Sequence, residues 1–188
     1  MSQKASPDTG RIALNLWLFG YGSLIWRPDI DYIERRPAKI HGWTRRFWQG
    51  SHDHRGVPDS PGRVVTLVPD PGEYCHGMAY LVDQSVAEST FAQLDHREKN
   101  GYERHSVALH FHEDDTSTMG LVYIASQNNH AYLGPAPLAE MVRQIRVSAG
   151  PSGRNIDYLL ALADALRRLD AEDSHVFELE SAVKDFES

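Results

Sequence analysis

The sequence predicts an α+β fold arranged around a largely antiparallel β-sheet or barrel. Apolar runs rich in β-branched and aromatic residues follow one another through the first two thirds of the chain, and helical periodicity appears mainly afterwards. Because these strands are not alternated with helices, a doubly wound parallel sheet is disfavoured. With 188 residues, 41% hydrophobic and 24% charged, the chain can bury one core without disulfides or metals.

Six strands are expected from this pattern, each bounded by Gly, Pro or Asp. They cover residues 16–19, 39–48, 63–68, 76–82, 106–112 and 119–125. Two stretches between them, VPDSPG at 57–62 and VPDPG at 68–72, have the composition of turns. Each of these stretches is therefore expected to connect two strands.

Three helices are expected, over residues 85–99, 138–149 and 155–169. In the first, Val86, Phe91 and Leu94 recur at the spacing of one helix face. Gly101 supplies a residue at which that helix can end. The third helix carries an apolar stripe of the same kind, so both helices should pack against the sheet.

We expect a single domain at residues 13–188, preceded by a flexible, polar N-terminal tail at residues 1–12. The end of the chain, from Asp164 to Ser188, is acidic. We expect it to be a solvated helix or a loose tail.

The charge and cysteine content argue against several classes of protein. The 26 Asp and Glu exceed the 19 Lys and Arg, which gives a formal charge of −7, whereas a general nucleic-acid-binding protein usually has a basic excess. The single Cys75 cannot form an intramolecular disulfide, which favours a cytoplasmic location. No stretch reaches the roughly 18 to 20 apolar residues of a membrane span. The sequence thus predicts no nucleic-acid and no membrane partner.

The negative average conceals one basic segment, at residues 35–63. It holds seven Lys and Arg against two Asp, a local charge of +5. Trp43, Phe47 and Trp48 lie among these cations, a pattern that a nucleic-acid surface or a strand with one wet and one buried face can produce. The strand interpretation is favoured, and attraction of a small anionic substrate to a nearby pocket is the further prediction.

The first candidate site is the sequence FGYGSLI, in which a predicted strand runs into a turn with two glycines. Such a turn brings backbone N–H groups close to a ligand, where they can bind an anion or an oxyanion. An ordinary tight turn would explain the same spacing. Ser23 is not a predicted nucleophile, because the Gly-x-Ser-x-Gly elbow requires Gly where Tyr21 stands.

The second candidate is Glu98, which helical spacing places on the same face as Phe91 and Leu94, at the end of the first predicted helix. Burial and the negative end of the helix dipole would both raise the pKa of its carboxyl toward neutrality, where a general base works best. A carboxylate that reaches solvent or pairs with a neighbouring cation such as Arg97 is the alternative.

Two histidine pairs, His52-x-His54 and His110-x-His112, could each present both rings on one face of an extended segment. Zinc can bind such pairs, but neither pair has a third ligand at a recognised spacing, and Cys75 has no CxxC partner. No metal is therefore expected, and a histidine-dependent metallohydrolase stays a minor alternative.

Five blocks of the sequence together carry a resemblance to a known family. They are LWLFGYGSLIW at 16–26, RRFWQGSHDHRGVPDSPGRVVTL at 45–67, LDHREKNGY at 94–102, YLGPAPL at 132–138 and AGPSGRNIDYLL at 149–160. In these blocks the chain resembles the ChaC-type γ-glutamylcyclotransferases, the glutathione-specific branch of the γ-glutamylcyclotransferase superfamily, and its short-form subgroup in particular. His52 stands where the family pattern has Thr, and the acidic end beyond about residue 169 matches none of its blocks.

The resemblance implies a small, mostly antiparallel β-barrel with surrounding helices and a site at its mouth. It implies an enzyme without a cofactor that cleaves reduced glutathione into 5-oxoproline and Cys-Gly, by attack of the substrate α-amine on its own γ-glutamyl carbonyl. Glu98 matches the family's catalytic position, as general base and then general acid. The implied substrate-binding residues are Gly20, Tyr21, Gly22, Ser23, Leu24 and Ile25, and the blocks at 132–137 and 152–155 belong to the pocket or its frame.

A non-catalytic γ-glutamyl-binding or regulatory protein with the same pocket is the alternative, and the presence of Glu98 counts against it. Reduced glutathione, a small molecule, is the only partner that the resemblance implies. The sequence leaves open the oligomeric state and the preference among γ-glutamyl substrates.

Overall fold

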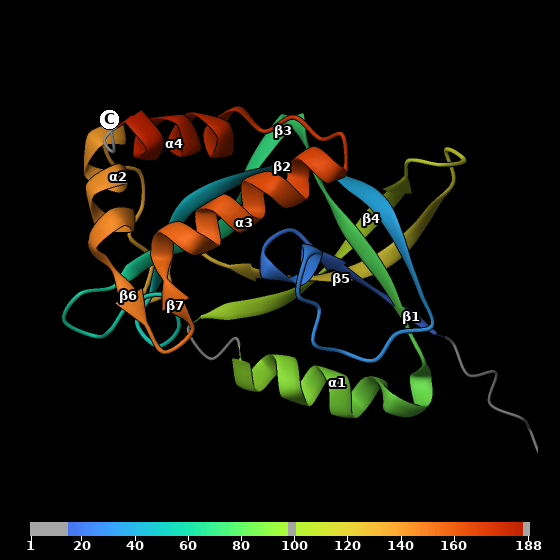
Figure 1. The fold of residues 1–188 in the computed structure, drawn as a ribbon. Coiled ribbons are helices and arrows are strands. Elements are labelled where there is room, and N and C mark those ends of the chain that lie inside the picture. The colour runs from blue at the N-terminus through green and yellow to red at the C-terminus, as the bar shows by residue number, and fades with distance from the viewer. Residues whose placement is uncertain (1–14, 98–100, 186–188) are drawn as a thin grey trace, which may run out of the picture.

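Five strands close into a barrel at the centre of the molecule (Figure 1). Their bounds are β1 Leu16–Gly20, β2 Glu34–Ser51, β3 Gly62–Val82, β4 Tyr102–Phe111 and β5 Ser117–Ala125. Their order is β1-β3-β2-β4-β5; β1 and β5 pair in parallel, and every other pair is antiparallel. This computed structural model describes residues 15–97 and 101–185, so the expected tail at 1–12 lies outside it. The mostly antiparallel barrel is confirmed.

The two longest strands, β2 and β3, form a continuous ribbon that corrects one expectation. Residues 63–68 and 76–82 belong to a single strand, and the VPDPG stretch between them does not reverse the chain. The pairing shifts from His41 with Tyr74 to Trp43 with Pro69, so several residues of β3 lie opposite Gly42 alone. The prolines lack a donor for the ladder, but a bulge tolerates them while the strand continues on either side. The VPDSPG stretch at 57–62 lies between β2 and β3 and forms the expected turn.

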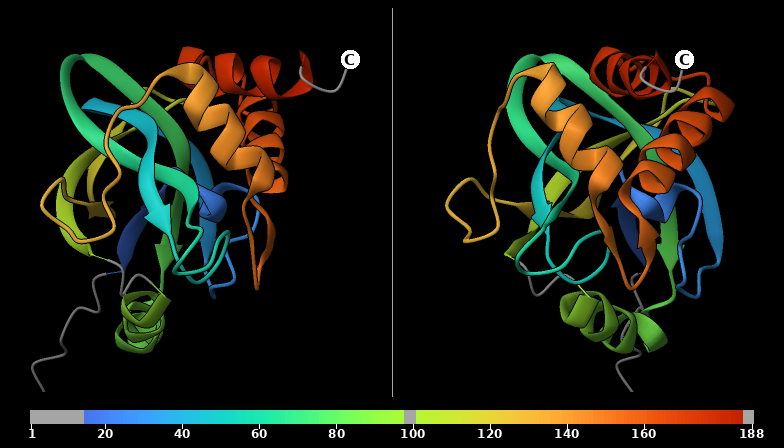
Figure 2. Two further views of the ribbon diagram at one scale, coloured as in Figure 1. Left: turned by 90° about the vertical axis from the view of Figure 1, so that its left-hand side faces the viewer. Right: turned by 60° about the vertical axis from the view of Figure 1, so that its left-hand side comes forward.

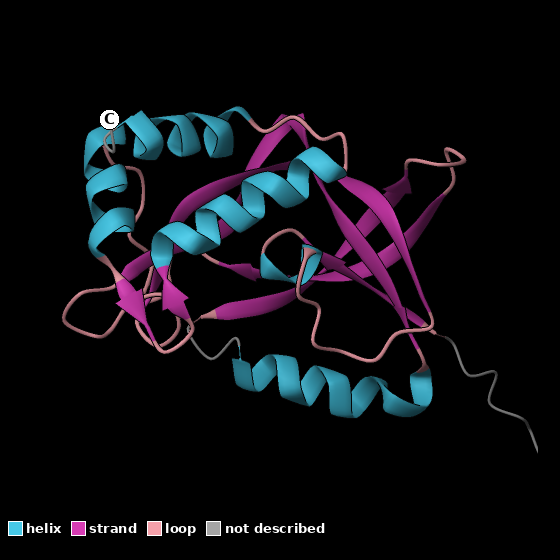
Figure 3. Cartoon of the chain, in the orientation of Figure 1, coloured by secondary structure: helices cyan, strands magenta, loops and turns pink. Residues whose placement is uncertain are grey.

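Helices surround the barrel in the part of the chain that the structure describes (Figure 3). They are the 3₁₀ helix η1 Ser23–Ile25 and the α-helices α1 Gln84–Arg97, α2 Leu138–Val147, α3 Asn155–Arg168 and α4 Ser174–Asp185. The short strands β6 Ala149–Gly150 and β7 Gly153–Arg154 form a hairpin between α2 and α3. The three expected helices are present to within a few residues. None of the described helices is long and apolar enough to cross a membrane.

Helix α1 lies by itself at one end of the molecule, away from the other α-helices (Figures 1 and 2). Its buried Phe91 and Leu94 pack against Leu18 of β1, Val82 of β3 and Tyr123 of β5. The apolar face predicted from the sequence is therefore the face that packs on the barrel, as amphipathic periodicity requires.

Helices α2, α3 and α4 pack on one another, and α3 crosses one side of the barrel (Figure 2). In α4, Val176, Leu179 and Val183 are completely buried. Glu180 is also buried and is paired with Arg167 and Lys184. The acidic end of the chain is thus a docked helix through Asp185, because its apolar residues outweigh the cost of removing one paired carboxylate from water.

A buried cation, Arg45 of β2, connects the barrel to its surroundings. Its side chain is 1% exposed and its Nη1 donates to Asp173, between α3 and α4, at 2.6 Å. Burial lowers the pKa of Arg45, but its interactions with Cys75 and Asp173 raise it by more. The pKa of Arg45 therefore lies above the usual value for arginine. Because burial also raises the pKa of the Cys75 thiol to about 11, Cys75 is neutral at physiological pH and Asp173 supplies the balancing negative charge.

His175 fixes the start of α4 to the barrel. Its Nε2 accepts a hydrogen bond from the backbone N–H of Phe47 in β2, at 3.0 Å, so this nitrogen must be unprotonated. Burial, aided by the positive charge of Arg46, lowers the pKa of His175 to about 4.

This contact predicts sensitivity to mild acid. An unfolded histidine has a pKa of about 6.5. The unfolded state therefore binds a proton at a higher pH than the folded state, and stability falls as pH drops from about 6.5 to about 4. Between pH 7.5 and pH 5, urea unfolding should show a loss of about 2 kcal/mol from this group. The variant His175→Gln should lack this part of the loss, and exposed His130→Gln should retain it; equal pH profiles for both variants would contradict the assignment.

Candidate active site

The chain leaves β1 at Gly20 and turns at once into the 3₁₀ helix η1. The N–H of Ile25 donates to the carbonyl of Gly22 at 3.0 Å, and the N–H of Arg27 donates to the carbonyl of Ser23 at 2.8 Å. The first N–H groups of a helical turn have no acceptor inside it. Those of Gly22, Ser23 and Leu24 accordingly have no backbone acceptor among the described residues, and they form a group of donors that a ligand can use.

Three hydrogen bonds, all at least partly buried, hold this loop in place. The Arg45 Nε donates to the carbonyl of Tyr21 at 2.7 Å, and the Tyr80 hydroxyl donates to the carbonyl of Leu24 at 2.5 Å. The Tyr21 hydroxyl donates in turn to the carbonyl of Tyr123 at 2.8 Å. Burial raises the pKa of Tyr80 to about 12, so its hydroxyl stays protonated and able to donate. The loop is therefore positioned before any ligand arrives.

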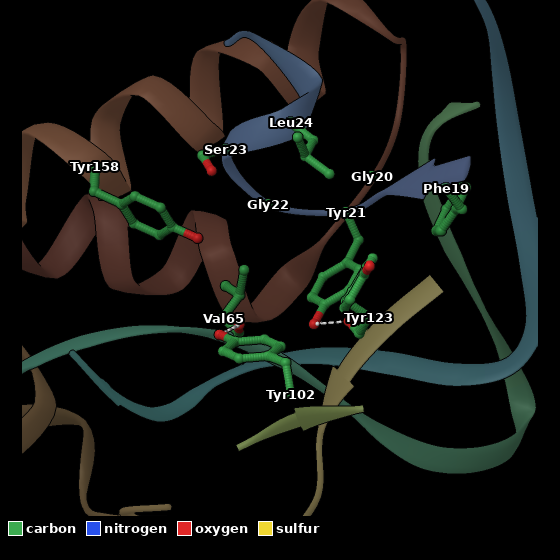
Figure 4. A pocket seen from close by; sticks show the side chains of 10 residues that line it. All are labelled: Phe19, Gly20, Tyr21, Gly22, Ser23, Leu24, Val65, Tyr102, Tyr123 and Tyr158. Atoms are coloured by element: carbon green, nitrogen blue, oxygen red, sulfur yellow. Dashed lines mark hydrogen bonds between the residues drawn. The ribbon is translucent and has the colours of Figure 1, made fainter. Parts of the chain in front are cut away.

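A cleft opens beside the loop (Figure 4). Its lining consists of Phe19, Gly20, Tyr21, Gly22, Ser23, Leu24, Val65, Tyr102, Tyr123 and Tyr158. Figure 4 shows the Tyr158 hydroxyl pointing toward the cleft from α3, while Tyr102 and Val65 lie on the opposite side from the loop. The cleft has an aromatic lining with polar hydroxyls, and none of its described lining residues is a carboxylate or a cation.

The two glycines permit this close packing. A Cβ on Gly22 would lie 2.9 Å from the Tyr158 hydroxyl and 3.0 Å from a methyl of Val65, and a Cβ on Gly20 would lie 2.5 Å from that of Leu24. Any larger residue would have to displace these neighbours. The glycines therefore bring the loop backbone against the cleft, beyond what an ordinary turn requires.

Comparison with known proteins identifies the family. The family model described as "ChaC-like protein" matches residues 16–186 of this chain. The chain belongs to this family. The match includes most of the acidic end, so the expectation that nothing beyond about residue 169 corresponds to the family is wrong.

Curated relatives cover nearly the whole chain. The glutathione-specific γ-glutamylcyclotransferase 1 of Danio rerio is 42% identical in an alignment of 176 residues that covers 90% of this chain and 89% of the relative. The glutathione-specific γ-glutamylcyclotransferase of Schizosaccharomyces pombe is 40% identical over 188 residues, covering 90% of this chain and 93% of the relative. A crystal structure of a γ-glutamylcyclotransferase from yeast, described as specific to glutathione, superimposes with a TM-score of 0.86 at 32% identity, covering 92% of this chain and 96% of that one.

The structure gathers most of the predicted substrate-binding loop of this ChaC-like chain around the cleft. Gly20, Tyr21, Gly22, Ser23 and Leu24 line it, while Ile25 is buried in the core behind the loop. Glu98 lies outside the described residues.

Sequence reasoning did not single out the tyrosines opposite the loop. Tyr102 and Tyr158 stand within the blocks at 94–102 and 149–160, and their place in those family-like blocks could have marked them as candidate site residues. Nothing in the local sequence distinguished Tyr123, because its place in the cleft depends on how β5 closes the barrel.

The basic segment does not face the cleft as a whole. Arg45 and Arg63 are buried and hold the frame, whereas Arg36 pairs with Asp114 at 2.7 Å. Arg45 contacts the lining from the core side, through the carbonyl of Tyr21, and Arg55 contacts it from the loop between β2 and β3, with its guanidinium carbon 5.6 Å from the ring centre of Tyr158. A strand with one wet and one buried face accounts for most of the pattern, as favoured from the sequence.

The blocks at 132–137 and 152–155 lie in the frame. Buried Arg63 donates to the carbonyl of Gly134 at 3.1 Å, and the side chain of Asn155 bonds both the N–H and the carbonyl of Arg63 at 2.7 Å. The Ser152 hydroxyl lies 3.1 Å from His54 Nδ1. These contacts hold the start of α3, and hence Tyr158, in position.

The histidines do not assemble a metal centre in the described part of the chain, where no group of three or more His, Cys, Asp or Glu could hold an ion. His112 instead lies beside His76, with Nε2 and Nδ1 3.2 Å apart. Burial lowers the pKa of both rings, which favours their neutral forms.

The tight packing at Gly22 gives a test of the cleft. Gly22→Ala should force the loop away from Tyr158 and Val65 and lower kcat/KM by about tenfold or more, because a small displacement of a positioning group is costly. The matched control is Gly72→Ala, whose Cβ would meet nothing within 4 Å. Steady-state kinetics and thermal unfolding of both variants would measure the effect; wild-type kinetics in Gly22→Ala would show that the loop does not contact substrate.

Proposed function

We propose that the protein is a glutathione-specific γ-glutamylcyclotransferase, which converts reduced glutathione into 5-oxoproline and Cys-Gly. The observation that carries this proposal is the glycine loop beside the cleft, in a chain 40–42% identical to relatives of that activity over about 90% of its length. The proposed location is the cytoplasm, since the chain has one buried cysteine and its substrate is abundant where thiols stay reduced.

The reaction depends more on the positioning of the substrate than on a strong nucleophile from the protein. The α-amine of the substrate forms a C–N bond to its own γ-carbonyl carbon, and the C–N bond to cysteine breaks. The substrate starts with an α-ammonium group, which loses two of its three protons when the nitrogen becomes the lactam N–H. The amide nitrogen of cysteine gains two protons and leaves as the ammonium group of Cys-Gly, so the reaction balances. A single base that accepts a proton and then returns it can serve each transfer.

The loop donors supply the electrostatic part of the mechanism. The N–H groups of Gly22, Ser23 and Leu24 lie at the start of η1 and beside the cleft, where they can hold the γ-glutamyl group and stabilise the oxyanion of the tetrahedral intermediate. Because the loop is tied by Arg45 and Tyr80, these donors need no reorganisation during the reaction. The aromatic walls limit the poses of the flexible γ-glutamyl arm and favour ring closure.

Glu98 is the proposed proton carrier. In the chain it directly follows α1 and precedes Tyr102, a lining residue, by four positions. The described lining contains no carboxylate, so a carboxylate base must come from outside those ten residues. Glu98 also stands in the sequence block that resembles the catalytic segment of the family.

Replacing the carboxyl by an amide tests this role. Glu98→Gln should lower the rate of 5-oxoproline and Cys-Gly formation by at least about 100-fold, because an amide cannot accept the proton. Glu88→Gln, on the exposed side of α1, is the matched control and should retain activity. Product formation is followed by chromatography, and thermal unfolding verifies that both variants fold.

Two outcomes would overturn the proposal. Full activity in Glu98→Gln would exclude Glu98 as the proton carrier. A wild-type protein that binds glutathione by calorimetry but forms no product would instead be the non-catalytic γ-glutamyl-binding protein.

A further inference from the structure

The negative charge of the substrate requires a positive partner that the described cleft lining does not supply. Reduced glutathione has two carboxylates, one at the γ-glutamyl end and one at the glycine end. The described lining contains no cation, and the protein as a whole has a formal charge of −7. A tight and selective site for such an anion needs at least one fixed positive group near the cleft.

Arg55 is the cation placed to meet this need. It lies in the connection between β2 and β3, and its guanidinium stands over the ring of Tyr158, one side chain beyond the cleft. Its Nη1 donates to the carbonyl of Arg154 at 3.2 Å. The neighbouring Arg154 and Arg27 are paired with Asp157 and Asp29, whereas no carboxylate lies within 4 Å of the Arg55 guanidinium among the described residues.

The environment of Arg55 favours an incoming anion. The side chain is partly buried, and burial lowers its pKa although Tyr158 and the nearby carboxylate of Asp157 act in the opposite direction. A guanidinium nevertheless remains charged in proteins. Such a partly desolvated charge lacks a full ionic partner, and a carboxylate ligand would supply one through charge-assisted hydrogen bonds.

The backbone around Arg55 is held rigidly. Its N–H donates to the Ser51 hydroxyl at 2.9 Å, and the N–H of Ser152 donates to the carbonyl of His54 at 2.9 Å. A Cβ on Gly62 would lie 2.8 Å from the Arg55 carbonyl carbon, so these segments touch at backbone distance. The β6–β7 hairpin thus clamps the loop that carries the guanidinium, as expected of a recognition group that must be positioned in advance.

We infer that Arg55 binds the glycine carboxylate of glutathione, a role that rests on the proposed function. The γ-glutamyl end is the part that the loop donors of Gly22, Ser23 and Leu24 can bind. The Cys-Gly portion then extends away from the loop, past Tyr158, toward the face of that ring on which Arg55 stands. Recognition of the terminal carboxylate would distinguish glutathione from γ-glutamyl compounds that lack it.

The experiment pairs a variant with a modified substrate. Arg55→Met and Arg55→Lys are assayed with glutathione and with glutathione whose glycine carboxylate is an ethyl ester. With glutathione, Arg55→Met should raise KM about 10- to 100-fold with a much smaller change in kcat, and Arg55→Lys should fall between it and the wild type. With the ester, wild type and Arg55→Met should differ by less than about threefold.

Controls separate recognition from folding. Arg168→Met removes an exposed arginine of α3, whose side chain is 75% exposed, and should match the wild type with both substrates. Thermal unfolding reports whether Arg55→Met is folded, and Arg55→Lys retains a cation if it is not. An equal KM increase for glutathione and ester, or no increase for either, would overturn the inference. Failure of the wild type to turn over glutathione at all would instead overturn the proposed function.

Discussion

A single buried guanidinium, that of Arg45, joins the parts of this molecule that must cooperate. From the barrel interior it donates to the carbonyl of Tyr21 in the glycine loop, to the carbonyl of His76 in β3 and to Asp173 between α3 and α4. Taking this charge out of water is costly, and it is tolerated because an anion and two carbonyls compensate it together. The loop, the barrel wall and the helical layer therefore have fixed relative positions.

That constraint explains how a cleft with uncharged walls can serve catalysis. In the proposed reaction the nucleophile and the leaving group both belong to the substrate, so the described site needs only to supply backbone donors and aromatic walls that position it. Gly22 lets the loop approach Tyr158 and Val65, and α3 brings Tyr158 from the far end of the sequence. The described part of the site is thus built from packing that is established during folding.

Local patterns in the sequence predicted the elements better than their connections. The periodicity around Phe91 and Leu94 is a property of one helix and was confirmed, whereas the turn at 68–72 was wrong because the neighbouring strand β2 stabilises a bulge there. Composition alone could not show that Arg45 lies buried in the frame, since burial depends on distant partners such as Asp173. The glycine loop is a local motif, so it was recognisable from sequence. The tyrosines opposite it were not, because their place in the cleft depends on distant parts of the chain.

A structure of Glu98→Gln with glutathione bound would test the account most directly. The account predicts the γ-glutamyl group in the cleft of Figure 4, with its carbonyl oxygen within hydrogen-bond distance of N–H groups from Gly22 to Leu24, and the glycine carboxylate at Arg55. Glutathione bound elsewhere on the protein, or with its γ-carbonyl turned away from the loop, would contradict it.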